Sequence, residues 1–352
     1  MSREIVFNGE CVNDDSDMYV IAEIGHNHQG DLEQCKKLFR AAKDCGVNAV
    51  KLQKRDNRAL FTKAKYDSLY DNPNSYGATY GEHREFLEFG HEEYKVLSDL
   101  AKELGMTFFS TPFDFKSADF LEEYNTPMYK IASGDLLNIP LMKYVANFGK
   151  PMIVSTGGGV LDDVRRAYDA IMPINSQLAI LQCTSSYPAR PDQLNFRVIE
   201  SYRKEFPDIV IGYSGHDNGI VLPIVSFMLG ARIVEKHFTL DRSLKGTDHS
   251  FSLAPTGMKN MVRDLQRARE SLGTGEKGID KGEIEPLTKM GKKLVAAKSL
   301  PEGHVLTAND IMIKSPGGGL PPYEFDNVVG KKLSCSLGMD EDILFENLQG
   351  NK

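Results

Sequence analysis

The chain has 352 residues, of which 41% are hydrophobic and 26% charged, a composition typical of a folded enzyme of about two domains. Its 42 basic and 49 acidic residues give a net charge of −7, which argues against a nucleic-acid-binding protein. We see no run of roughly 20 apolar residues that could span a membrane and no signal segment. The five cysteines form no CxxC pair, so we expect reduced thiols and a cytoplasmic protein.

Eight short runs rich in Val and Ile alternate with longer amphipathic segments. The runs occupy residues 18–24, 49–53, 107–111, 128–131, 152–156, 178–182, 209–213 and 232–237. Each is too short for a helix and predicts a strand buried on both faces of a parallel sheet. Between them, residues 32–45 and 91–104 have apolar side chains at helical spacing and end before a glycine.

Eight strand-plus-helix units predict an α/β fold, a (β/α)8 TIM barrel over residues 1–272. An open doubly wound sheet is the alternative, but its GxGxxG fingerprint is absent after the first strand. Residues 273–290 begin with a polar, glycine-rich stretch and predict a linker.

Short strands are expected in the tail at residues 293–297, 311–314 and 332–335, separated by turns that contain Pro and Gly. Residues 291–352 therefore predict a small all-β domain. Because so small a domain buries little apolar surface by itself, we expect it to pack on the barrel or on another subunit.

Polar residues follow the predicted strands at their C-terminal ends, where barrel enzymes have their active sites. Lys51 and Lys130 stand inside otherwise apolar runs. Hydroxyl side chains occur at four strand ends: Thr111, Ser133, Ser155 and Ser214. Lysine charge and hydroxyl donors suit an anion, most simply a phosphate. The alternative is that the hydroxyls only end strands and the lysines reach solvent, but two such lysines favour the anion site.

His216 and His237 end the seventh and eighth predicted strands. Adjacent strands lie about 4.8 Å apart, so both imidazoles can bind one divalent ion, and imidazole suits Mn, Fe, Co, Ni or Zn better than Mg. Three further polar residues lie close in sequence: Glu235, Asp248 and His249. These favour a metal site over two structural histidines. His26 and His28 are a second candidate pair, for which a hydrogen-bonded loop is the preferred interpretation.

The motifs around these residues resemble those of the sialic acid synthases. In chain order they read IAEIGHNHQGD, VKLQ, TPFD, YKIASGD, VSTGG, QCTSSYP, IGYSGH and VEKHFTLD. The tail stretches LPEGHVLTANDIMIKSPGGG and NVVGKK resemble the antifreeze-like (SAF) domain fused to those enzymes. The resemblance implies a TIM barrel followed by an SAF domain. It also implies condensation of phosphoenolpyruvate with an N-acetylmannosamine-type sugar and a divalent metal, with Mn²⁺ expected and Mg²⁺ or Co²⁺ as alternatives.

The resemblance assigns site residues position by position. The implied catalytic residues are Glu23, Lys51, Lys130, His216 and His237, the two histidines being the metal ligands. The implied substrate contacts are Gln53, Thr111, Ser133, Asp135, Ser155, Ser185, Tyr187, Ser214, Asp248 and Lys314. Two positions depart from the family: Ser185 replaces an asparagine common in bacterial members, and Ser315 replaces an arginine that reaches the sugar of a partner subunit. Lys314 is then the remaining cation at that place.

The stretches TYGEHREFLEF, QCTSSYP, GYSGH and KGTDHS look closest to the animal-type enzymes that use a 6-phosphorylated sugar. A second phosphate needs cations, and His83, Arg84 and Lys245 are available, although the sequence does not place them. Related synthases make pseudaminic, legionaminic or deaminated (KDN-type) acids with the same motifs. The family also implies a domain-swapped homodimer in which the SAF domain covers the partner's barrel mouth.

Two other classes of protein remain as alternatives. A class I aldolase would use Lys51 or Lys130 as a Schiff-base nucleophile and would need no metal. An ice- or carbohydrate-binding protein would act through the tail, but it would have no need of the lysines and histidines at the barrel mouth.

Overall fold

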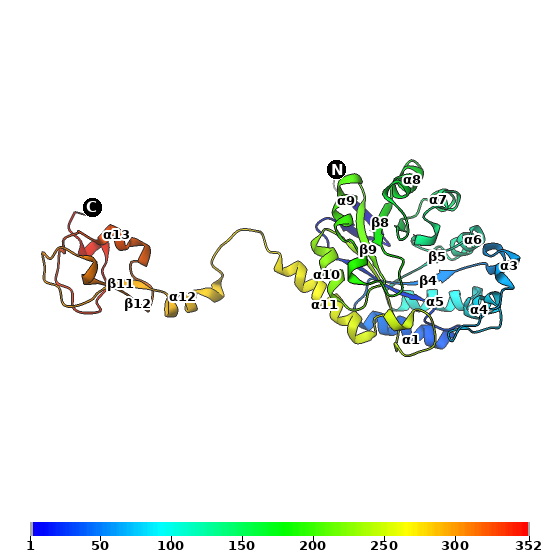
Figure 1. Ribbon diagram of the computed structural model, residues 1–352, viewed down its shortest axis with the longest axis horizontal. Helices are drawn as coiled ribbons and strands as arrows, with labels where there is room; N and C mark the ends of the chain where they lie inside the picture. The colour runs from blue at the N-terminus through cyan, green and yellow to red at the C-terminus, as the bar shows by residue number, and fades with distance from the viewer. Residues whose placement is uncertain (1–2, 351–352) are drawn as a thin grey trace. The chain divides into compact units, whose positions relative to one another are not determined.

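A closed barrel of eight parallel strands forms the first part of the chain in the computed structural model, which describes residues 3–350 (Figure 1). The barrel strands are β3 (Tyr19–Gly25), β4 (Ala49–Lys54), β5 (Thr107–Pro112), β6 (Tyr129–Ile131), β7 (Met152–Ser155), β8 (Leu178–Cys183), β9 (Val210–Gly215) and β10 (Ile233–His237). They lie in chain order, and the barrel closes because β10 pairs with both β3 and β9. The predicted TIM barrel is confirmed.

Both faces of the barrel strands are buried, so their sequences lack the alternation of a half-exposed strand. Along β3, Tyr19 and Ile21 pack in the barrel interior, whereas Val20 and Ala22 pack outward against the helices. Glu23 continues the inward series at the C-terminal end of the strand. The two-residue period thus places apolar side chains deep in the barrel and a polar one at its mouth.

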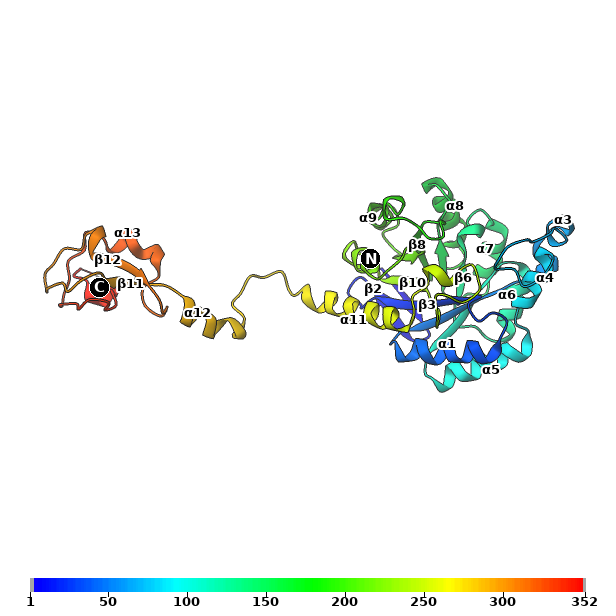
Figure 2. The same ribbon diagram turned by 60° about the horizontal axis from the view of Figure 1, so that its bottom comes forward.

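Helices surround the barrel (Figures 1 and 2). They are α1 (Leu32–Asp44), α2 (Asn57–Leu60), α3 (Lys63–Tyr66), α4 (Tyr80–Leu87), α5 (His91–Glu103), α6 (Phe115–Glu123), α7 (Ile139–Ala146), α8 (Leu161–Ile171), α9 (Arg197–Glu205), α10 (Val221–Met228) and α11 (Pro255–Ser271). Helices are found where the spacing predicts them, at α1 and α5. The Asp31 side chain caps α1 by accepting from the backbone N–H of Glu33 at 2.8 Å. The connection from β4 to α5 holds three extra helices, α2 to α4.

A hairpin closes the N-terminal end of the barrel, and the sequence reading did not predict it. It consists of β1 (Glu4–Phe7) and β2 (Glu10–Asn13), joined by Asn8 and Gly9 with φ of +49° and +87°. Its apolar side chains join the core inside the barrel: Ile5, Phe7 and Val12. The C-terminal ends of the strands are therefore the open end.

Residue contacts divide the chain into two units, residues 1–272 and 273–352. The second unit contains α12 (Ile284–Met290), β11 (Lys293–Ala296), β12 (Ile311–Lys314) and α13 (Phe325–Val328). Short 3₁₀ turns in the two units are η1 (Ser133–Asp135), η2 (Pro191–Gln193), η3 (His249–Phe251), η4 (Lys281–Glu283), η5 (Ala308–Asp310), η6 (Pro322–Glu324) and η7 (Phe345–Asn347). Part of the stretch read as a linker is thus helical.

The small unit has a two-stranded antiparallel sheet, β11 with β12, over an apolar core of its own. The prediction of a strand at residues 332–335 is wrong. Lys332 and Leu333 instead make isolated bridges to two different segments, at Val305 and Leu348, so no continuous ladder forms.

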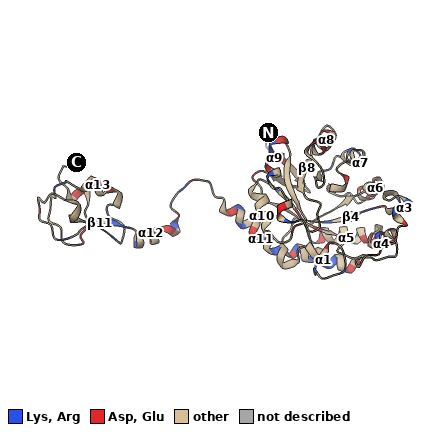
Figure 3. Ribbon diagram, viewed as in Figure 1, with Lys and Arg blue, Asp and Glu red and all other residues tan. Residues whose placement is uncertain are grey.

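Basic and acidic residues are interspersed on the outer helices, as Figure 3 shows for α1, α5 and α11. None of the helices between residues 3 and 350 is long and apolar enough to cross a membrane.

Candidate active site

A cavity of about 310 Å³ lies at the C-terminal ends of the barrel strands, where the sequence predicts the site. The sequence-predicted residues that line it are Glu23, Lys51, Gln53, Thr111, Lys130, Ser133, Ser155, Tyr187, Ser214, His216, His237 and Asp248. Every barrel strand, or the loop that follows it, contributes at least one of them. Closure of the barrel therefore brings residues that are far apart in the chain together around one cavity.

Three of the expected substrate contacts do not line this cavity. The Asp135 carboxylate is turned toward Asn138, whose Nδ2 donates to it at 3.0 Å. Ser185 is exposed on the loop after β8. Lys314 belongs to the second unit, where its ammonium pairs with Asp340.

Two buried lysines and two buried carboxylates occupy the floor of the cavity. Lys51 Nζ lies 2.5 Å from Glu23 Oε2 and 3.8 Å from Glu235 Oε1, and it donates to Thr111 Oγ1 at 2.9 Å. The barrel register explains the first contact, because Glu23 on β3 pairs directly with Lys51 on β4. Lys130 is equally buried, and burial lowers its pKa below the ordinary value of a lysine.

The two carboxylates differ in their proton affinity. Burial raises the pKa of Glu23 above its ordinary value, although Lys51 opposes this. Burial also disfavours ionisation of Glu235, but the charges of Lys130 and Lys51 outweigh it and lower the pKa of Glu235. Displacement of two neighbouring carboxyl pKa values in opposite directions is typical of sites where the two groups have different acid–base roles.

His216 and His237 face each other across the ends of β9 and β10, with ring centroids 5.4 Å apart. His216 Nδ1 lies 2.9 Å from the backbone oxygen of Thr184, which places the proton on Nδ1 and leaves the Nε2 lone pair free. Burial lowers the pKa of His237 to about 3, so this imidazole is neutral, as a metal ligand must be. Asp248 Oδ2 lies 3.6 Å from His237 Nδ1.

Three buried polar atoms of the cavity have no hydrogen-bond partner among residues 3–350: Ser155 Oγ, Glu235 Oε2 and His237 Nδ1. Buried polar atoms are normally paired, so this set indicates room for a polar ligand. No group of three or more His, Cys, Asp or Glu side chains in the described part of the chain is arranged as a closed metal site. The two imidazoles fit an open site, in which water or substrate oxygens complete the coordination of a divalent ion.

Two arginines also line the cavity: Arg55, which is not among the predicted site residues, and Arg84, which was expected as an available cation without a position. Arg55 has a sequence signal, since Lys51, Gln53 and Arg55 follow the two-residue period of β4 and its extension. Arg84 has no such signal, because it comes from α4 in the inserted segment.

Two of the other candidate histidines, His28 and His249, have structural surroundings. His28 is buried, stacks on Phe89 at 4.1 Å and accepts from the backbone N–H of Gly30 at 3.1 Å. These contacts agree with the hydrogen-bonded loop. His249 Nδ1 lies 2.7 Å from Thr239 Oγ1, and His249 does not line the cavity.

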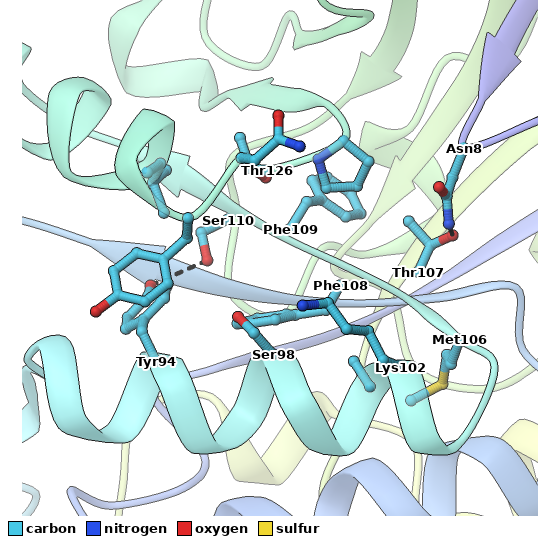
Figure 4. Close-up of a pocket in the computed structure, with 15 residues that line it drawn as sticks. Asn8, Tyr94, Ser98, Lys102, Met106, Thr107, Phe108, Phe109, Ser110 and Thr126 are labelled. Carbon is cyan, nitrogen blue, oxygen red and sulfur yellow. Dashed lines mark hydrogen bonds between the residues drawn. The ribbon is translucent and has the colours of Figure 1, made fainter.

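A second cavity, of about 240 Å³, lies outside the barrel between α5, β5 and α6 (Figure 4). Figure 4 shows Tyr94 of α5 reaching Ser110 of β5, and their hydroxyl oxygens are 3.0 Å apart. Its walls are mainly apolar and aromatic, and none of its lining residues is a His, Asp or Glu. It lacks the acid, base and metal-binding groups that make the first cavity the candidate active site.

Comparison with known proteins decides the family. The NeuB family model matches residues 38–277, and the SAF domain model matches residues 293–349. The chain belongs to the NeuB family. The N-acetylneuraminate-9-phosphate synthase of Homo sapiens is 39% identical over 339 residues, covering 96% of this chain and 94% of the relative.

Other NeuB-family relatives differ in the product for which they are named. The N,N'-diacetyllegionaminic acid synthase of Legionella pneumophila is 36% identical and covers 94% of both chains. The solved structure of the N-acetylneuraminic acid (sialic acid) synthetase of Leptospira borgpetersenii has a TM-score of 0.71 at 30% identity, covering 82% of this chain and 96% of that one. This NeuB-family chain is thus an enzyme of the sialic acid synthase class, with a TIM barrel and an SAF domain.

Proposed function

We propose that this enzyme condenses phosphoenolpyruvate with N-acetylmannosamine, or with its 6-phosphate, to give N-acetylneuraminate or its 9-phosphate plus inorganic phosphate. The proposal rests on one observation, that Lys51, Lys130, His216 and His237 line the same cavity. The two ammonium groups can bind the anionic donor, phosphoenolpyruvate. The imidazole pair beside them can hold a metal ion that polarises the aldehyde carbonyl of the sugar. A legionaminic, pseudaminic or KDN-type acid is the alternative product.

Phosphoenolpyruvate would bind at the end of the cavity where the two lysines lie, which we call the donor site. Lys51 and Lys130 would bind the phosphate of phosphoenolpyruvate together with the hydroxyls of Ser133 and Ser155. The Ser155 hydroxyl supports this role, because it is buried, lines the cavity and lacks a partner among the described residues. Negative charge grows on the phosphate as it departs, and fixed cations and donors in a buried site stabilise that charge most strongly.

Carbon–carbon bond formation would take place between the two ends of the cavity. The C3 carbon of phosphoenolpyruvate attacks the aldehyde carbon of the open-chain sugar, and positive charge develops at C2. Water adds at C2, and the bond between C2 and the ester oxygen breaks, so that phosphate leaves with the bonding electrons. The raised pKa of Glu23 suits it to accept the proton that the water loses.

His216 and His237 would hold a divalent ion, which we propose to be Mn²⁺, with Mg²⁺ or Co²⁺ as alternatives. A bound ion of this kind supplies Lewis-acid polarisation of the sugar aldehyde. Asp248, 3.6 Å from the ring of His237, would orient that imidazole or the sugar.

The test is an assay of the full chain with Mn²⁺ and phosphoenolpyruvate labelled with ¹⁸O in the bridging oxygen. Candidate acceptors are mannose and N-acetylmannosamine, each free and 6-phosphorylated, and released phosphate and the new keto acid are identified by mass spectrometry. We expect phosphate and keto acid in equal amounts, with the label in the phosphate. Label retained in the keto acid, or phosphate release that does not depend on the sugar, would refute the reaction.

We also propose that the enzyme is a cytoplasmic homodimer in which the SAF domain of one subunit serves the barrel mouth of the other. The family resemblance supports the dimer, and two-fold dimers are the commonest oligomers. A cover over the mouth would exclude water and limit hydrolysis of the donor. The five free cysteines of the chain are consistent with a reducing compartment.

A further inference from the structure

A buried ion pair lies directly behind the two histidines of the cavity. One member is Asp217, the residue that follows His216, and the other is Lys236, the residue that precedes His237. Lys236 Nζ donates to Asp217 Oδ1 at 2.9 Å and also to the backbone oxygen of Asp217. Both side chains are 1% exposed. Neither of them lines the cavity, and the proposed reaction uses neither.

The two-residue period of the strands places this pair behind the site. His237 points into the barrel and lines the cavity, so Lys236, next to it on β10, points outward. His216 lines the cavity in the same way, and Asp217 next to it meets Lys236 on the outer side of the barrel. Each histidine is therefore joined by one peptide bond to a member of the ion pair.

A tyrosine completes the group. Tyr213 on β9 donates its hydroxyl to Asp217 Oδ1 at 2.5 Å, and its ring packs in the apolar layer between strands and helices. The other carboxylate oxygen, Asp217 Oδ2, is buried and has no hydrogen-bond partner among residues 3–350. Lys236 and Tyr213 thus hold a carboxylate that is shielded from solvent. We call these three residues, Tyr213, Asp217 and Lys236, the outer cluster.

The outer cluster packs directly on the backbone that leads to the first histidine. Gly215 on β9 pairs in register with Lys236 on β10. A Cβ atom on Gly215 would lie 2.7–2.9 Å from atoms of all three members of the outer cluster. Since such close approach is not possible, the cluster requires glycine at this position, immediately before His216.

The ion pair links the two strands at a point where their ladder has already ended. The pairing of β9 with β10 stops at Gly215 and Lys236, and His216 lies beyond the last residue of β9. On the side of β8, the backbone oxygen of His216 accepts from the backbone N–H of Ala189 at 3.1 Å. On the side of β10, the contact between Lys236 and Asp217 joins the strands again, one residue after His216.

We propose that the outer cluster is a set of positioning residues that fixes the separation of the His216 and His237 imidazoles and so sets the affinity of the site for a divalent ion. The ring centroids are 5.4 Å apart. In an open site with two protein ligands, small changes in the separation of the ligands weaken binding, and residues behind the ligands maintain it. The inference rests on the proposed metal site and is independent of the identity of the acceptor sugar.

The first test compares two tyrosines in similar surroundings. Tyr129 on β6 is buried like Tyr213, and its hydroxyl donates to Glu122 Oε2 at 2.6 Å. Glu122 also pairs with Lys150 at 2.8 Å, and these three residues do not line the cavity. Tyr213→Phe and its control Tyr129→Phe therefore each remove one buried hydroxyl from a group of tyrosine, carboxylate and lysine. The outer cluster, unlike the control group, adjoins the histidines.

Binding of Mn²⁺ to the full-length proteins is measured from the electron paramagnetic resonance signal of the free ion, with His216→Ala as the background for binding elsewhere. We expect Tyr213→Phe to raise the Kd for Mn²⁺ by about threefold or more, as for the loss of an ordinary hydrogen bond. Tyr129→Phe should bind Mn²⁺ as the wild type does. Equal affinities of these two variants would overturn the inference.

The second test separates positioning from stability. Asp217→Asn alone leaves the ammonium of Lys236 buried without its partner and should lower Tm. The double variant Asp217→Asn/Lys236→Met has no buried charge and should recover much of that loss. A pair that only stabilised the fold would then regain Mn²⁺ affinity together with Tm.

We expect the double variant to regain Tm and still bind Mn²⁺ at least about tenfold more weakly than the wild type. This is the lower end of the range for residues that support metal ligands, because the pair acts through the backbone. Wild-type affinity for Mn²⁺ in the double variant would overturn the inference.

Mn²⁺ binding requires neither substrate, which keeps the positioning role separate from the proposed reaction. If Mn²⁺ affinities change as expected but no acceptor sugar reacts, the condensation fails and the positioning role stands. If a sugar reacts while Tyr213→Phe and the double variant bind Mn²⁺ as the wild type does, the positioning role fails and the condensation stands. A wild type that binds Mn²⁺ no better than His216→Ala would refute the metal site and the positioning role together.

Discussion

Replacing Lys51 by methionine removes an ammonium group while keeping a side chain of similar length. In the wild type this group is 2.5 Å from one buried carboxylate, of Glu23, and 3.8 Å from a second, of Glu235. The side chains of the three residues are 7% exposed or less, so water cannot compensate for the loss. Leaving a buried charge without its partner costs about 3–5 kcal/mol. For a unit of this size we expect Tm to fall by roughly 6–20 °C.

The size of this effect should depend on pH. Without Lys51, the pKa of Glu23 rises further above its unfolded value, and burial already raises it in the wild type. A carboxyl whose folded-state pKa is raised lowers stability above that pKa, and the penalty disappears as pH falls toward the unfolded value. The difference between wild type and Lys51→Met should therefore be largest at neutral pH and smaller near pH 5.

Calorimetric or circular-dichroism melts of four proteins test this reasoning: wild type, Lys51→Met, Glu23→Gln and the double variant. The double variant has neither the ammonium nor the Glu23 charge, so it should recover at least half of the Tm lost by Lys51→Met. An unchanged Tm in Lys51→Met, or no recovery in the double variant, would show that Lys51 does not compensate the charge of Glu23.

Three further predictions concern activity and assembly. EDTA should abolish activity and Mn²⁺ or Co²⁺ restore it, and His216→Ala or His237→Ala should each lower kcat by about 100-fold or more; undiminished turnover after chelation would contradict the metal site. Lys130→Ala should raise the KM for phosphoenolpyruvate and lower kcat, while borohydride with substrate should not inactivate the wild type; inactivation would favour a Schiff-base aldolase. Analytical ultracentrifugation should show a dimer, and a fully active monomer would refute the proposed assembly.

Much of the barrel could be predicted from the sequence because its strands are buried on both faces. A strand in that environment needs apolar side chains at successive positions, so each of the eight strands stands out as a short run between helical segments. The same runs made Lys51 and Lys130 visible, since a lysine among buried residues needs an anionic partner. The tail offers a contrast, because Lys332 and Leu333 pair with Val305 and Leu348, and such non-local pairs leave no periodic signal.

The sequence by itself therefore determined the barrel, the polar strand ends and the family motifs. Only the tertiary structure decided which charges share a partner. Lys51 meets Glu23 because their strands pair in register, and Arg84 reaches His26 because the segment between β4 and α5 folds back over the mouth of the barrel. The spacing of residues along a helix or strand specifies the face that a side chain occupies. It does not specify which distant charge that face will meet, because the contact depends on barrel closure and on the path of an inserted segment.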